Sequence, residues 1–66
     1  MNKNEFKAEL VKCGQTYVSL AKAIGISENT LWRKVNGWNE FTLPEIKKIA
    51  CELCLDDGRM KAIFFN

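Results

Sequence analysis

The stretch "LAKAIGISENTLWRKVNG", residues 20–37, has the pattern of two short helices joined by a tight turn. Two helices that cross closely through such a turn need a small side chain where they touch and a turn residue that tolerates a positive φ. Ala21 and Gly25 meet these two requirements, and Ile26 adds an apolar side chain within the turn. The stretch therefore predicts a helix-turn-helix. Its structural positions are Ala21, Gly25, Ile26, Leu31 and Val35.

Helix caps continue this pattern on both sides of the motif. Asn4, Thr16 and Ser27 each precede a run of apolar residues at helical spacing and can act as N-caps. Each run is followed by a glycine, which is common just after a helix ends. These glycines are Gly14, Gly25 and Gly37. The faces that we expect to be buried are Phe6, Leu10 and Cys13 in the first helix and Val18, Leu20, Ala21 and Ile24 in the second.

The strongest start signal is "TLPE", residues 42–45. Thr42 is the expected N-cap, Pro44 lies in the first turn where its missing N–H costs nothing, and Glu45 completes a capping box. The apolar pattern continues through Leu55, and "DDG" then leads into a short terminal helix or turn. The predicted buried stripe of this fourth helix is Ile46, Ile49, Ala50, Leu53 and Cys54.

No segment shows the alternation of a strand. We therefore predict an all-α fold, a compact bundle of about five short helices that forms one domain over residues 1–66.

Composition excludes several classes of protein. The chain has 66 residues, of which 47% are hydrophobic and 27% charged, as in a folded globular domain and unlike a disordered segment. No apolar run approaches the ~20 residues of a membrane span. The polar opening "MNKNEFK" also lacks the apolar centre of a secretory signal. We expect a cytoplasmic protein without a membrane partner.

The cysteines Cys13, Cys51 and Cys54 are expected to be small, reduced core residues. The spacing in "CELC" arises easily in a helix, where residues three apart share a face. A structural zinc needs four ligands, whereas the chain has three thiols and no histidine. We therefore predict no metal site and no cofactor.

The chain also lacks the residue patterns of an enzyme. It has no histidine, no glycine-rich phosphate loop, no nucleophile elbow and no paired-carboxylate constellation. A chain this short also has little material to enclose a substrate pocket. We expect neither catalysis nor a small-molecule substrate.

The two segments "LAKAIGISENTLWRKVNG" and "FTLPEIKKIACELCL", with "IFF" near the end of the chain, resemble the small helical DNA-binding domains of phage Cro and repressor proteins. The resemblance covers residues 16–65. It implies a lambda-repressor-like fold of about five helices, whose third helix enters the major groove of a double-stranded DNA operator. It also implies a homodimer on DNA and a role as a phage or prophage transcription regulator. One departure is Lys34, where family members often have an apolar residue, the apolar position here being Val35.

The spacing of residues 27–37 independently shows which side chains of this helix face outward. At ~100° per residue, Val35 lies at about 40° from Leu31, so the two share the buried face. Arg33 lies at about 200° and Asn29 at about 160°, on the opposite face. The outward stripe is Asn29, Thr30, Arg33 and Asn36, and Trp32 lies at its boundary.

Asparagine and arginine side chains can bond bidentately to adenine and guanine edges, and the N-terminal residues of such a helix point into the groove. Simple solvation of a polar surface remains an alternative for the whole face. Glu28 can equally stabilise the helix dipole, and Thr30 can complete the cap at Ser27. The candidate base-reading residues are Ser27, Glu28, Asn29, Thr30 and Arg33.

Charge is distributed unequally along the chain. Residues 1–39 hold six Lys or Arg and three acids, net +3, whereas residues 40–66 hold four and five, net −1. The half with the predicted reading helix is the basic half, although the total of +2 is mild for a DNA-binding protein and favours a dimer. Trp38 could instead pack over Val35. The candidate phosphate or backbone contacts are Tyr17 with the neighbouring amides, Lys34, Asn36, Gly37, Trp38 and Asn39.

The apolar C-terminus holds Ile63, Phe64 and Phe65. We expect two of them in the core and the third at a dimer interface. The predicted function is sequence-specific binding of duplex DNA by a transcription regulator. The alternative is a protein-interaction module on the same fold, an antirepressor or docking domain that does not itself bind DNA.

Overall fold

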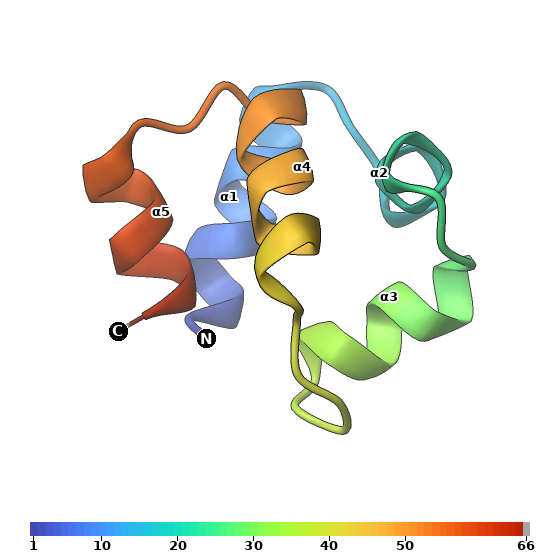
Figure 1. Ribbon diagram of the computed structural model, residues 1–66. Coiled ribbons are helices and arrows are strands. Elements are labelled where there is room, and N and C mark those ends of the chain that lie inside the picture. Colours follow the sequence, from blue (N-terminus) through green and yellow to red (C-terminus); the bar gives the residue numbers. More distant parts are fainter. Residues whose placement is uncertain (66) are drawn as a thin grey trace.

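The computed structural model describes residues 1–65 and contains within them five α-helices and no strand. Figure 1 shows α4 in front of α1, with α5 on one side of this pair and α2 on the other. The predicted all-α bundle is confirmed. No helix of the described residues is long and apolar enough to cross a membrane. The helices are α1 (Lys3–Lys12), α2 (Tyr17–Ile24), α3 (Glu28–Val35), α4 (Leu43–Glu52) and α5 (Asp57–Phe64).

Each helix begins at a residue whose side chain accepts a hydrogen bond from a backbone amide of the first turn. Thr16, Ser27 and Thr42 are the N-caps of α2, α3 and α4, as predicted. The predicted capping box is also present, because the Thr42 hydroxyl accepts from the Glu45 amide and the Glu45 carboxylate accepts from the Thr42 amide at 2.8 Å. The starts of these helices are therefore encoded locally.

The start of α1 differs from the prediction. Its N-cap is Asn2, whose side chain accepts from the Glu5 amide at 3.2 Å, and not Asn4. The amide of Asn2 donates to the carbonyl of Ile63 at 2.6 Å, which ties the beginning of the chain to α5. A contact between distant parts of the chain thus selects one of two possible asparagine caps.

The core lies where the five helices meet. Phe6 is at its centre, with its ring centroid 6.0 Å from that of Tyr17 and 6.4 Å from that of Phe64. Every helix contributes buried apolar residues, and so does Leu53, the C-cap of α4. The fully buried large side chains are Phe6, Leu20, Leu31, Ile49, Leu53 and Ile63.

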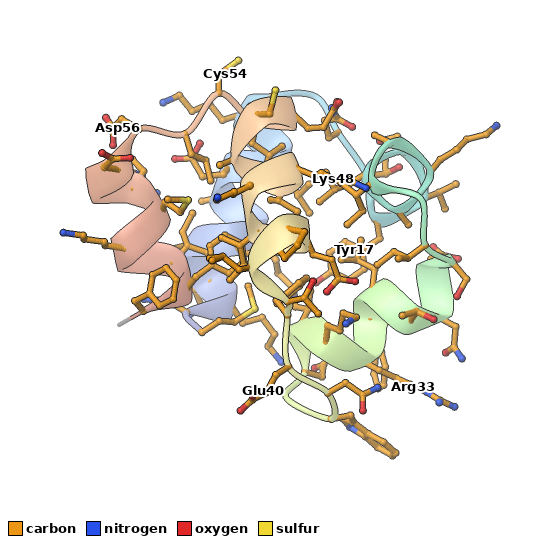
Figure 2. The ribbon with its side chains drawn as sticks, in the orientation of Figure 1. Tyr17, Arg33, Glu40, Lys48, Cys54 and Asp56 are labelled. Carbon is orange, nitrogen blue, oxygen red and sulfur yellow. The ribbon has the colours of Figure 1, made fainter. Side chains whose placement is uncertain are left out.

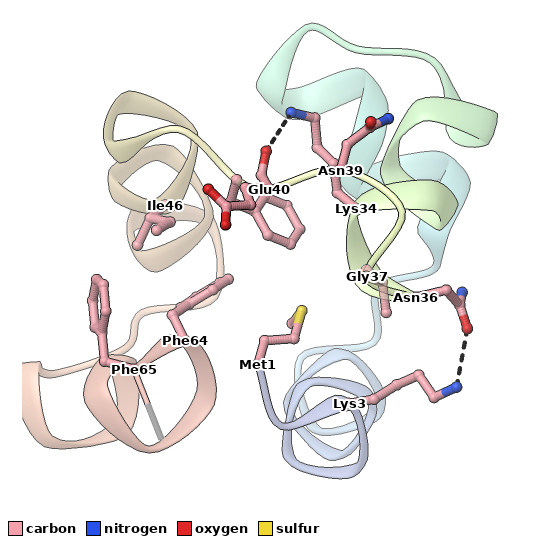
Figure 3. Close-up of a pocket in the computed structure, with 12 residues that line it drawn as sticks. Met1, Lys3, Lys34, Asn36, Gly37, Asn39, Glu40, Ile46, Phe64 and Phe65 are labelled. Atoms are coloured by element: carbon pink, nitrogen blue, oxygen red, sulfur yellow. Dashed lines mark hydrogen bonds between the residues drawn. The ribbon is translucent and has the colours of Figure 1, made fainter.

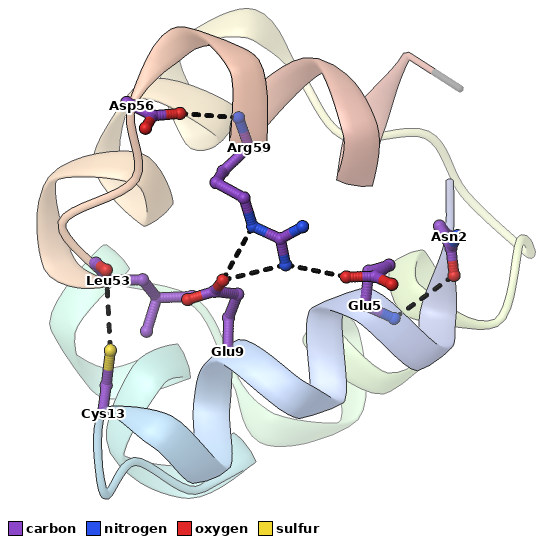
Figure 4. Close-up of polar contacts among 7 residues, drawn as sticks. All are labelled: Asn2, Glu5, Glu9, Cys13, Leu53, Asp56 and Arg59. Atoms are coloured by element: carbon purple, nitrogen blue, oxygen red, sulfur yellow. Dashed lines mark hydrogen bonds and ion pairs between the residues drawn. The ribbon is translucent and has the colours of Figure 1, made fainter.

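All three cysteines are exposed, so the prediction that they belong to the core is wrong. Cys51 lies two residues after Ile49, which at ~100° per residue places it on nearly the opposite side of α4. Cys13 and Cys54 follow the last turns of α1 and α4, and the φ of +52° at Cys54 turns the chain away from the helix. The thiol of Cys13 donates to the carbonyl of Leu53 at 3.5 Å (Figure 4).

Two further predictions about helices are wrong. Val18 is exposed, because at ~100° per residue it lies on nearly the opposite side of α2 from the buried Leu20. The fourth helix ends at Glu52 and not at Leu55, because the chain turns at the C-cap, Leu53.

A cluster of charged side chains joins α1 to α5 (Figure 4). The guanidinium of Arg59 donates to the Glu5 carboxylate at 2.7 Å and, through its Nε, to that of Glu9 at 2.9 Å. The hydrogen bonds to Glu5 and Glu9 raise the pKa of Arg59 above its ordinary value. Glu9 is the only buried charged residue among those described, and its partner satisfies it.

Candidate nucleic-acid interface

The helices α2 and α3 are joined by a short turn, residues 25–27, and pack against each other. Gly25 has a φ of +83°, in the left-handed region that favours glycine. The amide of Ile26 donates to the carbonyl of Ala21 at 3.0 Å, and Ala21 is buried. Leu31 and Val35 are buried beneath α3. The predicted structural positions thus hold α3 on the body through one face.

The opposite face of α3 is open. Figure 1 shows α3 at the edge of the molecule, and in Figure 2 the side chain of Arg33 points away from the body. Asn29 and Arg33 are both exposed, and neither side chain makes a hydrogen bond or ion pair within residues 1–65. The predicted rotation of this helix is therefore confirmed, and its two polar side chains are available to a ligand.

The other three predicted base-reading residues lie at the start of α3: Ser27 is its N-cap, and Glu28 and Thr30 are in its first turn. Ser27 and Thr30 bond to each other, with 2.8 Å between their hydroxyl oxygens, and the Thr30 amide donates to Ser27 at 3.1 Å. The hydroxyl groups of these two residues therefore form the N-terminal cap of α3. Glu28 is exposed and makes no polar contact within the described residues. Among the five predicted base-reading residues, the side chains without a partner in residues 1–65 are Glu28, Asn29 and Arg33, and only Asn29 and Arg33 lie on the face opposite Leu31 and Val35.

The loop after α3 uses the amides of its first two residues, Gly37 and Trp38, in hydrogen bonds to the helix. The amide of Gly37 donates to the carbonyl of Lys34 at 3.3 Å, and that of Trp38 to the carbonyl of Arg33 at 2.8 Å. A phosphate contact through the amides of Gly37 and Trp38 would therefore compete with the end of the helix. Asn39 is exposed, and no hydrogen bond of its amide occurs within residues 1–65.

Asn36 also has internal partners. Its side-chain oxygen accepts from the ammonium of Lys3 at 3.0 Å (Figure 3), and its side-chain nitrogen donates to the carbonyl of Trp32 at 2.9 Å. The side chain of Asn36 thus connects Lys3, near the N-terminus of the chain, to the end of α3. A DNA contact by this side chain would require these bonds to break.

Lys34 has a structural role in place of the predicted phosphate contact. Its ammonium lies 2.9 Å from the Glu45 carboxylate and 3.0 Å from the carbonyl of Glu40 (Figure 3), and its side chain is only 12% exposed. The charge of Lys34 and its place near the following loop favour a phosphate contact, but its position on α3 also indicates packing against the body. At ~100° per residue, it lies only about 80° from the buried direction of α3, which was a signal that it could reach α4.

The pKa of Glu45 follows from this contact. Burial acts to raise the pKa, but hydrogen bonds from the Thr42 amide and the Lys34 ammonium outweigh burial and lower it. A carboxyl whose pKa is lower in the folded state stabilises the fold above its unfolded-state pKa, and this stabilisation is lost as the pH falls through the folded-state value.

We expect Glu45→Gln, which retains the side-chain acceptor of the capping box but not the charge, to remove part of the loss of stability in acid. The measurement is the free energy of unfolding in urea, at neutral pH and at pH values below the ordinary pKa of glutamate. Glu52→Gln, an exposed change near the end of the same helix, is the control. Identical pH dependence of the wild type and Glu45→Gln would contradict the ion pair.

Tyr17, a predicted phosphate contact, is half-buried against the core. Burial raises the pKa of its hydroxyl above the ordinary value. A tyrosine hydroxyl can donate a hydrogen bond. Tyr17 and Val18 are the first two residues of α2, and their amides have no acceptor within the described residues. This helix start therefore offers donors to an anion.

Of the two environments considered for Trp38, packing over Val35 is not observed. Trp38 is 70% exposed, and its ring centroid lies 6.3 Å from that of Trp32, which is 45% exposed. The two indoles are tilted by 53°. They form an exposed aromatic pair beside Arg33, here called the tryptophan pair.

A groove of about 650 Å³ lies between the N-terminus, the end of α3, the following loop and the end of α5 (Figure 3). Its apolar lining includes Met1, Phe41 and Phe64. Ile63 is buried and Phe64 half-buried, whereas Phe65 is 59% exposed at the groove. Two of the three terminal apolar residues thus belong to the core or pack against it, and the third is exposed.

No group of three Cys, Asp or Glu side chains in residues 1–65 is arranged to hold a metal ion. Comparison of the chain with models of protein families, with curated proteins and with solved structures finds no match.

Proposed function

We propose that this protein is a sequence-specific regulator of transcription that binds duplex DNA through α3. The observation that carries the proposal is the two-sided character of this helix. Leu31 and Val35 are buried, while Asn29 and Arg33 on the opposite side are exposed without internal partners. Amide and guanidinium groups can pair with adenine and guanine edges in the major groove, and a helix on the edge of a small domain can enter that groove.

Phosphate contacts would position α3 in the groove. The best donors are the amides of Tyr17 and Val18 at the start of α2, where the helix dipole also favours an anion. The hydroxyl of Tyr17 and the amide of Asn39 complete the proposed set. Lys34 and Asn36 are left out of it, because their side chains already bond within the protein.

Selection of binding sites from random duplex sequences at low salt tests this function. We expect one sequence to be enriched, and the logarithm of its affinity to fall linearly with the logarithm of salt concentration. A variant with both Asn29→Ala and Arg33→Ala should enrich no sequence while retaining its helical circular dichroism. If the folded wild type enriches none, DNA reading by α3 is ruled out.

The rival function is a protein-interaction module. The groove, whose lining is partly apolar and partly polar, and the exposed Phe65 favour it, because exposed apolar side chains within a concave surface suit a protein partner. In that case a selection from random DNA enriches nothing, although the protein is folded.

We propose that the same groove joins two copies of the chain. A single protomer presents one reading helix and a net charge of only +2, so a two-fold pair would bind an operator much more tightly. The groove has Lys3 and Glu40 at its edge, and opposite charges on one patch suit a self-complementary interface.

We expect Phe65→Ser to shift the mass in solution from dimer toward monomer, in the presence of the selected duplex. Val11→Ser is the matched control, because Val11 is 79% exposed on α1 and does not line the groove. The mass is measured by sedimentation. Monomers for both the wild type and Phe65→Ser on DNA would contradict a dimer through this surface.

A further inference from the structure

The tryptophan pair has no role in the core. Trp32 and Trp38 are 45% and 70% exposed, although a 66-residue chain has few large apolar side chains to spare for its surface. Each indole can bury on the order of 150–250 Å². Two neighbouring indoles left in water therefore mark a contact surface.

The pair is held on α3 and does not hang in a loose loop. Gly37 turns the chain with a φ of +83°, and the amide of Trp38 then donates to the carbonyl of Arg33 at 2.8 Å. Trp32 directly precedes Arg33 on the helix. The indoles thus keep a defined position next to the outward face of α3.

The chemistry around the pair does not suit a phosphate. The C-terminal end of a helix carries a partial negative charge, which repels an anion. Lys34, the lysine nearest to both indoles in the sequence, is paired with Glu45. The amides of Gly37 and Trp38 donate to carbonyls of the last turn of α3. Apart from the Arg33 guanidinium, which is assigned to a base edge, the largest exposed groups at this end of α3 are therefore the two indole rings.

Duplex DNA has apolar groups beside the base edges that an indole can contact. They are the 5-methyl group of thymine in the major groove and the faces of the deoxyribose rings. A second protein copy is a less suitable occupant, because the pair adjoins the proposed reading residues and neither indole lines the groove with Phe65.

We propose that Trp32 and Trp38 together bind the apolar groups of duplex DNA, a thymine methyl or deoxyribose, next to the bases contacted by Asn29 and Arg33. The pair then adds affinity through apolar contact, and a preference for thymine where the methyl group is the contact. This inference rests on the proposed function of α3.

The test uses the full chain and the duplex enriched from random sequences. Intrinsic indole fluorescence of the wild type should shift to shorter wavelength when the duplex is added. Trp32→Ala and Trp38→Ala should each bind about tenfold more weakly, from the loss of part of the buried indole area. Trp→Phe at either position should retain most of the affinity, and Val11→Ala, an exposed apolar change on α1, should retain all of it.

A second duplex with uracil in place of thymine distinguishes the two apolar groups. A loss of wild-type affinity that is absent in the double variant Trp32→Ala/Trp38→Ala identifies the thymine methyl. No loss on uracil substitution, with the alanine variants still weakened, identifies deoxyribose.

Wild-type affinity in both alanine variants, with fluorescence unchanged by DNA, overturns the inference while the proposed function of α3 stands. A fluorescence shift that follows protein concentration without DNA assigns the pair to a second copy and also overturns it. If no duplex is bound by the wild type, the proposed function and this inference fail together.

Discussion

Replacement of Arg33 or Asn29 by alanine is expected to weaken binding to the selected duplex by about 1–3 kcal/mol each, roughly 5- to 150-fold. Each variant leaves a base edge without its hydrogen-bond partner in the groove. Both side chains are exposed and without internal bonds, so neither change should alter the free energy of unfolding by more than about 0.5 kcal/mol. The measurement is a titration of labelled duplex at fixed salt concentration.

The matched control for charge is Lys61→Ala on α5, an exposed lysine outside α3. It removes the same unit of charge as Arg33→Ala, so it should lower affinity only slightly and equally for all sequences. Equal losses for Arg33→Ala and Lys61→Ala, on selected and unselected duplex alike, would mean that α3 contributes charge and no readout.

The second large effect is on stability. Phe6→Ala is expected to cost about 3–5 kcal/mol, because Phe6 is fully buried and its loss leaves a cavity between the rings of Tyr17 and Phe64. A domain of this size has a total stability of only about 3–10 kcal/mol, so the variant should be largely unfolded in mild urea.

Phe65→Ala is the control for Phe6→Ala. It removes the same ring from a position that is 59% exposed, and we expect a change within about 0.5 kcal/mol. Urea unfolding followed by circular dichroism measures both. Similar midpoints for the two variants would show that Phe6 is not at the centre of the core.

Much of the fold is predictable because its signals are local. Thr16, Ser27 and Thr42 cap their helices through bonds to amides at most three residues away. Apolar spacing within α3 likewise predicts that Leu31 and Val35 are buried and that Arg33 faces outward. These features depend on the geometry of one helix and need no knowledge of the others.

The errors concern residues whose environment comes from other parts of the chain. Lys34 bonds to Glu45, eleven residues away, and Asn36 bonds to Lys3, thirty-three residues away. We therefore exclude both side chains from the proposed DNA contacts. Residue type alone favours a core position for the cysteines. Their exposure depends on where α1 and α4 end and on which side of α4 meets the core.

The number and kind of helices, most of their starts and the outward face of α3 follow from local sequence, because caps and apolar periodicity act over one or two turns. Which polar side chains on and after α3 remain available depends instead on contacts between helices. Hydrogen bonds from α1 and α4 occupy Asn36 and Lys34 and leave Asn29 and Arg33 open. The tertiary structure also decides that Trp38 lies beside Trp32 in solvent, because the turn at Gly37 directs the chain away from the core.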